Sequence, residues 1–197
     1  LSRKRSQLLS GFQYERQSRV LEVGCGCGAI SRFLGETFGE VVSVEGNIHR
    51  ARLARKRTRD LGSLDVICAP FQKIEFVGKF DVIVCVGVFE YSASFIDAPD
   101  PFDAALRYFR SLLSETGVLI VAIENQFGLK YFNGCREDHL GTPFAGLEGY
   151  SATDQAVRTF GEQELQAMLH RYFPALQKYY PYPDYKMPEC VLAHEFV

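Results

Sequence analysis

The sequence predicts an α/β fold in which helices cover a mostly parallel β-sheet. Short apolar runs alternate with amphipathic, helix-like segments along most of the 197 residues, which is typical of strands joined by helical crossovers. A glycine-rich turn follows the first apolar run, and no helical pattern separates the last two extended runs. We therefore expect a three-layer sandwich around a seven-stranded sheet that ends in an antiparallel strand pair.

Five apolar runs are the predicted strands of the parallel part of the sheet. Their length suits strands better than helices. Their nearly continuous apolar character suits strands that are buried on both faces. They lie at residues 19–23, 41–45, 64–69, 80–86 and 118–123.

Helical patterns follow the first two of these strands. Ile30, Phe33 and Leu34 have the i, i+3, i+4 spacing of a helix that packs on a sheet. Asn47 is a suitable N-cap for a second helix over residues 48–61. We therefore expect each of these strands to be followed by a helical crossover.

Two further helices are predicted later in the chain. Pro101 is a good first-turn residue for one of them. Thr159 and Glu162 have the spacing of a capping box at the start of the other. The first helix has an apolar stripe that consists of Phe102, Leu106, Phe109 and Leu113.

The C-terminal region departs from the alternating pattern. Residues 176–180 and 190–197 both read as extended, with the turn-forming segment PYPDYKMP between them. Without a helix between them, they are expected to pair as an antiparallel hairpin.

The segment of residues 125–160 is too long for a routine connection and is expected to be a functional insertion. We expect one domain over residues 1–197, excised from a longer chain because the first residue is Leu1.

The composition is that of a globular domain. Hydrophobic residues make up 47% and charged residues 23% of the chain, which are ordinary proportions. The formal net charge of −2 provides no overall field to recruit nucleic acid or a membrane surface. The basic run at residues 49–57 is expected to form a solvated helix face rather than an RNA-binding surface.

The localisation expected from the sequence is cytoplasmic. No apolar stretch approaches the roughly 20 residues that span a bilayer, and no secretory signal is visible. The six cysteines form neither a disulfide framework nor a zinc pattern, which favours a reducing compartment.

The segment LEVGCGCG, at residues 21–28, joins the first strand to a helix. Its glycines permit a tight turn and a close approach of a ligand to the backbone. The pattern also fits a dinucleotide fingerprint, so an NAD-dependent oxidoreductase is an alternative. Glu45 ends the second strand, where a carboxylate can bind ribose hydroxyls. Glu22 favours S-adenosylmethionine (SAM), because a carboxylate attracts its sulfonium and ammonium groups and repels a pyrophosphate.

Three features together resemble the motifs of the class I SAM-dependent methyltransferases. They are ExGxGxG at residues 22–28, Glu45, and FDVIVCVGVFEY at residues 80–91. The resemblance implies a Rossmann-like sheet, SAM as cofactor and S-adenosylhomocysteine as product. Ala69 stands where the family commonly has an acidic residue, so contact with the adenine is expected from backbone groups and Phe71. The cofactor-binding residues implied are Glu22, Gly24, Cys25, Gly26, Gly28, Glu45, Gly46, Pro70, Phe71, Val86 and Gly87.

A narrower resemblance covers most of the chain, from about Arg19 onward, and is carried by residues 123–150 and 180–188. These segments resemble bacterial methyltransferase domains that occur with glycosyltransferases in surface-polysaccharide biosynthesis. The resemblance implies that the acceptor is a hydroxyl of a glycan or related metabolite, with a fused or partner glycosyltransferase. Other small molecules or a protein are alternative acceptors. A SAM-binding domain without turnover, which positions a glycosyltransferase, is an alternative of a different class.

Polar residues follow the fourth and fifth predicted strands. Glu90 and Tyr91 follow the fourth strand, and Glu124 and Asn125 follow the fifth. Ligands of open α/β sheets bind beyond the carboxyl ends of the strands. Glu124 is therefore a candidate for contact with the acceptor, although a structural pair with Asn125 explains it equally well.

His139 is the candidate general base. A hydroxyl acceptor is a poor nucleophile, and an imidazole has a suitable intrinsic pKa for taking its proton. Glu137 or Asp138 is expected to orient the ring. The alternatives are a surface loop histidine that follows two acids, and a histidine that anchors the insertion. The predicted catalytic residues are thus His139, Glu124 and Asp138.

Two other groups of residues have simpler explanations. Asp97, Asp100 and Asp103 fit helix-start and turn preferences better than a metal centre, so no metal site is expected. The aromatic residues of the insertion form either an apolar lid or a small satellite core. They are Phe127, Tyr131, Phe132, Phe144 and Tyr150.

Overall fold

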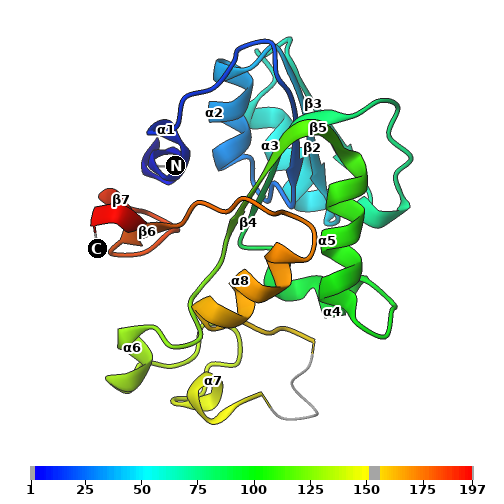
Figure 1. The fold of residues 1–197 in the computed structure, drawn as a ribbon. Coiled ribbons are helices and arrows are strands. Elements are labelled where there is room, and N and C mark those ends of the chain that lie inside the picture. Colours follow the sequence, from blue (N-terminus) through cyan, green and yellow to red (C-terminus); the bar gives the residue numbers. More distant parts are fainter. Residues whose placement is uncertain (1–2, 151–155, 197) are drawn as a thin grey trace. The chain divides into compact units, whose positions relative to one another are not determined.

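A computed structural model describes residues 3–150 and 156–196 of the chain (Figure 1). The chain divides into two compact parts. The sheet unit comprises the described residues of Leu1–Val86, Ser111–Ala122 and Gln177–Val197. The insertion unit comprises those of Gly87–Arg110 and Ile123–Leu176.

The sheet unit contains five parallel strands in the order β3-β2-β1-β4-β5 (Figure 1). All five predicted apolar runs are strands. The last of them begins earlier than predicted, because Leu113 already pairs with Phe80. The strands are β1 Arg19–Val23, β2 Glu40–Glu45, β3 Leu64–Cys68, β4 Phe80–Val86 and β5 Leu113–Ala122.

The last two strands form a sheet of their own. Strands β6 Tyr179–Tyr182 and β7 Cys190–Ala193 pair antiparallel with each other, as predicted. Within the described residues they are separate from the five-stranded sheet, so the prediction of one seven-stranded sheet is wrong. Each strand has four residues, and Pro181 in β6 lacks the N–H that a second neighbouring strand would need. A 3-10 turn at His194–Phe196 follows β7, where the sequence predicted more strand.

Two helices of the sheet unit cover the β1–β2–β3 half of the sheet. Helix α2, Ala29–Thr37, contacts β2, and helix α3, Ile48–Arg57, contacts β2, β3 and α2. The Asn47 side chain accepts hydrogen bonds from His49 N and Arg50 N, which confirms the predicted cap. Helix α3 ends at Arg57, four residues before its predicted end, and the hydroxyl of its C-cap Thr58 donates a hydrogen bond to the carbonyl of Ala54.

The exposed face of α3 carries the basic run. Only Ala51 and Ala54 are buried on this helix. Its basic side chains therefore form a solvated face, as predicted. The small buried residues on the opposite face allow the helix to approach Gly28 of the glycine loop closely.

The hydrophobic core of the sheet unit joins segments that lie far apart in the sequence. Leu8 and Leu9 come from helix α1 Gln7–Ser10, which follows a 3-10 turn at Arg3–Ser6. Burial of each large aliphatic side chain contributes about 1.5–3 kcal/mol. The cluster consists of Leu8, Leu9, Val20, Ile30, Leu34, Phe38, Val41, Leu64, Val82, Val84, Val86 and Tyr185.

The insertion unit contains mostly short helices. Its largest is α5, Pro101–Leu112, whose last two residues are part of the sheet unit. Phe102, Leu106 and Phe109 are buried on α5, which confirms most of the predicted stripe. None of the helices in the described part of the chain is long and apolar enough to cross a membrane. The other helical elements of this unit are η3 Phe89–Tyr91, α4 Ser92–Phe95, α6 Leu129–Phe132, α7 Ala145–Glu148 and α8 Glu162–His170.

A parallel β-bridge joins the two ends of the predicted insertion. Asn125 bridges to Phe160, and Gln126 N donates to Phe160 O at 3.0 Å.

The prediction that Thr159 and Glu162 form a capping box is wrong. The N-cap of α8 is Gly161, and the Thr159 hydroxyl instead shares a 2.5 Å hydrogen bond with the hydroxyl of Tyr150.

Candidate active site

The glycine loop after β1 has a left-handed backbone at three positions. Gly24, Gly26 and Gly28 have φ values of 71°, 56° and 76°. At Gly28 a Cβ atom would also lie 2.8 Å from the Cα of Ala54 on α3. Beside Gly26 there is open space. Glycine is therefore required at Gly28 by both packing and backbone conformation, and at Gly26 by backbone conformation alone.

Glu45 anchors this loop to the end of β2. Its Oε2 accepts a hydrogen bond from Gly26 N at 2.8 Å, and its Oε1 accepts one from Asn47 N at 2.9 Å. Arg50 lies 3.2 Å from Oε1. A carboxylate has about four acceptor positions, and these three contacts leave about one of them for a ribose hydroxyl, which the sequence predicts Glu45 to bind.

Glu22 lies beneath the loop. Its Oε2 accepts hydrogen bonds from Ser31 Oγ of α2 at 2.5 Å and from Ser43 Oγ of β2 at 2.7 Å. Burial raises the pKa of Glu22 to about 7, although the two serine hydroxyls favour its charged form. Glu22 thus connects α2 to β2, a role that its place in the glycine motif did not reveal. Burial also raises the pKa of the Cys25 thiol, as suits a small apolar residue.

The stability of the wild-type protein is expected to fall as pH rises from about 4.5 to 7. In the folded state Glu22 holds its proton up to a pKa of about 7, whereas in the unfolded chain it ionises near 4.5. The stabilisation is therefore complete below the unfolded pKa and is lost through the folded one. Its size is on the order of 3 kcal/mol. Urea unfolding of wild type and Glu22→Gln at pH 5 and pH 8 measures it, and equal pH dependence of the two proteins would contradict it.

The other predicted cofactor residues follow the carboxyl ends of parallel strands. Gly46 follows β2 and is exposed. Pro70 precedes a 3-10 turn at Phe71–Lys73 after β3, and the Phe71 ring is buried. Val86 ends β4, and Gly87 follows it with φ 66°. Parallel strands place these carboxyl ends along one edge of the sheet, where ligands of α/β folds bind.

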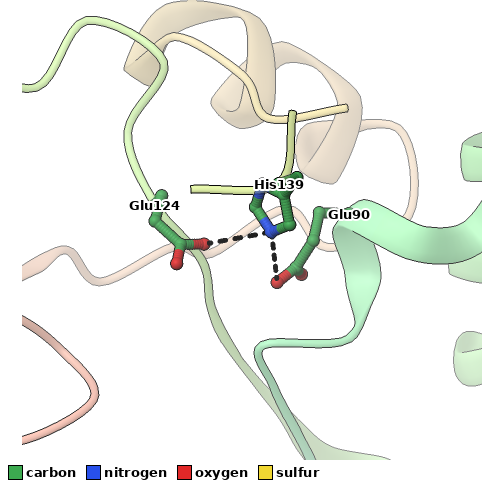
Figure 2. Close-up of side chains that lie close together, drawn as sticks. All are labelled: Glu90, Glu124 and His139. Atoms are coloured by element: carbon green, nitrogen blue, oxygen red, sulfur yellow. Dashed lines mark ion pairs between the residues drawn. The ribbon is translucent and has the colours of Figure 1, made fainter. Parts of the chain in front are cut away.

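A second group of polar side chains lies within the insertion unit. Glu90, Glu124 and His139 point toward one another (Figure 2). His139 Nε2 lies 3.8 Å from Glu90 Oε1 and 3.9 Å from Glu124 Oε2. These side chains are exposed by only 7% for His139, 1% for Glu90 and 3% for Glu124. The cluster is therefore withdrawn from bulk water.

Glu137 determines the orientation of His139. Its Oε1 lies 2.9 Å from His139 Nδ1, and its Oε2 accepts hydrogen bonds from the backbone N–H groups of His139 and Leu140. The Tyr91 ring packs edge-on against the imidazole, with 5.3 Å between ring centroids. Because Nδ1 makes a hydrogen bond with Glu137, the ring is oriented so that Nε2 faces Glu90 and Glu124.

The carboxylates control the charge of His139. Burial alone would lower its pKa, but Glu90, Glu137 and Glu124 raise it to about 9. Burial raises the pKa of Glu90, whereas the hydrogen bonds to Glu137 outweigh its burial and lower its pKa. These carboxylates favour the protonated form of the imidazole, so His139 is poorly suited to act as a general base.

The structure brings together two of the three predicted catalytic residues, Glu124 and His139. Asp138 instead makes an ion pair with Lys130 at 2.8 Å, so Glu137 is the residue that orients the ring. Glu90 was not among the predicted catalytic residues. The available signal was its position after β4, which matches that of Glu124 after β5.

The remaining candidates have structural explanations. Asp100 Oδ1 accepts a hydrogen bond from Asp103 N at the start of α5, and Asp103 pairs with Arg107, so the helix-start interpretation is confirmed for these two. Of the insertion aromatics, Tyr131 is buried as a satellite core would require. Phe127, Phe132 and Phe144 are exposed, and Tyr150 is half-buried.

The glycine loop and strand order define a class I SAM-dependent methyltransferase domain. The model of the family described as "Methyltransferase domain" matches residues 21–119 of the chain, which is half of its length and runs from β1 into β5. The chain belongs to this family. SAM is the cofactor of the class, and the matched region contains the glycine loop, Glu45 and the end of β4.

Comparison with individual proteins gives more distant matches. The chain is 26% identical over 117 residues to a ubiquinone biosynthesis O-methyltransferase of Histophilus somni, covering 56% of this chain and 46% of that protein. The chain thus spans about half the length of this curated relative.

Two solved structures share the fold over most of the chain. One is the N-methyltransferase NodS of Bradyrhizobium japonicum in complex with S-adenosylhomocysteine, with 15% identity, TM-score 0.62, and coverage of 97% of this chain and 81% of that one. The other is a putative methyltransferase of Haloferax volcanii in complex with the Trm112 activator. It has 17% identity, TM-score 0.63, and coverage of 90% and 69%.

Proposed function

We propose that this chain transfers the methyl group of SAM to a hydroxyl of a glycan or related metabolite. The observation that carries the cofactor half of the proposal is the hydrogen bond from Gly26 N to Glu45 Oε2, which fixes the glycine loop to the end of β2. Such preorganisation reduces the ordering cost of binding. Methyl transfer itself depends mainly on alignment, because the cofactor supplies the electrophile.

The acceptor half of the proposal rests on the polar cluster of the insertion unit. Glu90 and Glu124 present carboxylate oxygens in a buried setting, where they are suitable acceptors for a hydroxyl proton. An oxygen acceptor also agrees with the name of the Histophilus somni relative, an O-methyltransferase. We assign Glu124 and His139 to contact with the acceptor, and Glu137 to positioning His139.

A glycosyltransferase, fused or separate, is the partner that this proposal includes. Its support is the resemblance of residues 123–150 and 180–188 to methyltransferase domains that occur with such enzymes. A glycosyltransferase would supply the glycan to be methylated. A chain that binds SAM without turnover, and only positions such a partner, is the competing proposal.

Calorimetric titration with S-adenosylhomocysteine, with NAD as the comparison ligand, tests the cofactor site. We expect selective binding of S-adenosylhomocysteine. Loss of hydrogen bonds to a charged group costs about 1.5–3 kcal/mol, so Glu45→Ala should weaken binding roughly 10- to 100-fold. Glu115→Ala removes an exposed carboxylate of β5 and serves as the matched control. Binding of NAD alone would overturn the cofactor assignment.

Methyl uptake from labelled SAM into a panel of glycans and small hydroxylated metabolites tests the acceptor. The full-length protein is the appropriate sample, together with its Glu124→Gln variant. We expect transfer that Glu124→Gln reduces without weakening S-adenosylhomocysteine binding. Cofactor binding without transfer to any hydroxyl would favour the non-catalytic alternative, and transfer unaffected by Glu124→Gln would remove Glu124 from the site.

A further inference from the structure

The buried cluster of the insertion unit contains three groups that commonly bind metal ions. Glu90, Glu124 and His139 each offer one donor atom, and these three atoms lie within 4.8 Å of one another (Figure 2). Glu90 and Glu124 come from chain segments that follow β4 and β5, and His139 comes from the insertion. All three belong to one compact unit.

We propose that Glu90, Glu124 and His139 bind a divalent transition-metal cation. The sequence predicted no metal site, because helix-start and turn preferences explained the group Asp97, Asp100 and Asp103 better. The three donors are separated by 34 and 15 residues in the chain, and folding alone brings them together. The argument rests on their spacing, on an unpartnered buried oxygen, and on the orientation of the imidazole.

The spacing fits three ligands of one cation better than it fits hydrogen bonds. Nitrogen and carboxylate ligands lie about 2.0–2.2 Å from a bound zinc ion, which places two ligands roughly 3.4 Å apart at a tetrahedral angle. The distances from His139 Nε2 are 3.8 Å to Glu90 and 3.9 Å to Glu124. They are too long for hydrogen bonds, and small side-chain rotations would bring them to the coordinated spacing.

Glu90 supplies the second, independent observation. Its side chain is 1% exposed, and its Oε2 has no hydrogen-bond partner among residues 3–150 and 156–196. A buried carboxylate oxygen without a partner is costly unless a cation compensates it. The other oxygen of the same carboxylate faces His139. A cation bound by both oxygens of Glu90 would satisfy the whole carboxylate.

Glu137 provides the outer support that metal-binding histidines usually have. A ligating imidazole generally gives its other ring N–H to a carboxylate, which fixes the tautomer and the ring orientation. His139 has this arrangement, with Nδ1 at 2.9 Å from Glu137 Oε1 and Nε2 facing the cluster. Glu137 is itself fixed by the backbone N–H groups of His139 and Leu140.

The donor set indicates which cations are suitable. One imidazole nitrogen with two carboxylates suits Mn²⁺, Fe²⁺ or Zn²⁺ better than Mg²⁺ or Ca²⁺, which prefer oxygen ligands throughout. Three protein ligands also leave coordination positions open, as in catalytic metal sites. An acceptor hydroxyl at an open position would become more acidic. That role in acceptor binding rests on the proposed function, whereas cation binding itself does not.

Mn²⁺ is the best probe for this site. The chain has exposed thiols at Cys68, Cys135 and Cys190, which would bind Zn²⁺ at other positions, whereas Mn²⁺ has little affinity for thiolates. Electron paramagnetic resonance of free Mn²⁺ gives the number of bound ions directly. The titration uses the full chain without cofactor. The variants are Glu90→Gln, Glu124→Gln and, as a matched control, Glu148→Gln, which changes an exposed acid of the same unit.

We expect one Mn²⁺ per wild-type chain and an increase in the midpoint of thermal unfolding with Mn²⁺. Glu90→Gln and Glu124→Gln should each weaken binding at least 10-fold, while Glu148→Gln binds as wild type. Unfolding curves without Mn²⁺ show whether each variant is folded. Absence of binding at millimolar Mn²⁺, or binding that both cluster variants leave unchanged, would overturn the proposal. Because no SAM is present, this outcome is independent of the test of the cofactor site.

Discussion

Replacement of Gly28 with alanine is expected to destabilise the sheet unit by about 2–5 kcal/mol. Two costs add at this position. Its φ of 76° is in the left-handed region, which costs roughly 1–2 kcal/mol for a residue with a Cβ. The new Cβ would also lie 2.8 Å from the Cα of Ala54, and overpacking of this kind typically costs about 1–3 kcal/mol. Backbone in α3 would have to move to relieve it.

Alanine substitutions at two other glycines distinguish the cost of the left-handed backbone from the cost of overpacking. Gly26 has φ 56° and open space for a Cβ, and Gly62 has an ordinary φ and open space. Urea unfolding should therefore rank Gly28→Ala as most destabilising, Gly26→Ala as intermediate, and Gly62→Ala as nearly neutral. If Gly28→Ala lowers the free energy of unfolding no more than Gly26→Ala does, then α3 shifts away from the new Cβ without an energetic penalty. The close approach of α3 to Gly28 would then not be important for stability.

Replacement of Glu137 with alanine is expected to cost about 3–5 kcal/mol, the typical penalty for breaking a buried charged network. The buried carboxylate accepts hydrogen bonds from two backbone N–H groups, those of His139 and Leu140. It also holds His139 Nδ1 at 2.9 Å and accepts a 3.3 Å hydrogen bond from the hydroxyl of Tyr150. Alanine would leave all of these donors without their acceptor.

Hydrogen exchange is the suitable measurement, because it reports on the insertion unit by itself. We expect loss of protection at the amides of His139 and Leu140 in Glu137→Ala. Glu137→Gln retains one acceptor oxygen and should have an intermediate effect. Glu148→Ala, at an exposed acid of the same unit, is the control. Protection unchanged in Glu137→Ala would show that the surrounding packing, and not this carboxylate, holds the turn.

Local patterns in the sequence were sufficient to predict most of the sheet unit. Apolar runs located all five parallel strands, because a buried parallel strand requires apolar residues along its whole length. Asn47 located the start of α3, because an N-cap acts only on the N–H groups that follow it. The glycine loop could also be predicted from the sequence, because the left-handed backbone at Gly24, Gly26 and Gly28 is a property of the loop itself.

Contacts between distant segments explain the predictions that were wrong or incomplete. The sequence shows that β6 and β7 are extended, but which strands they pair with depends on hydrogen-bonding partners elsewhere in the fold. Likewise, Glu22 reads as a ligand contact by its position in the motif. The motif does not show that its Oε2 also accepts hydrogen bonds from Ser31 and Ser43, which are 9 and 21 residues away.

The sequence by itself determined the class of this protein, its cofactor loop and its strand positions, because these depend on periodicity and backbone conformation over a few residues. Only the tertiary structure decided the composition of the acidic cluster. It paired Asp138 with Lys130 and Glu137 with His139. It also placed Glu90 beside a histidine 49 residues further along the chain. The physical reason is that the charge and possible ligands of a buried side chain depend on which groups, distant in the sequence, folding places next to it.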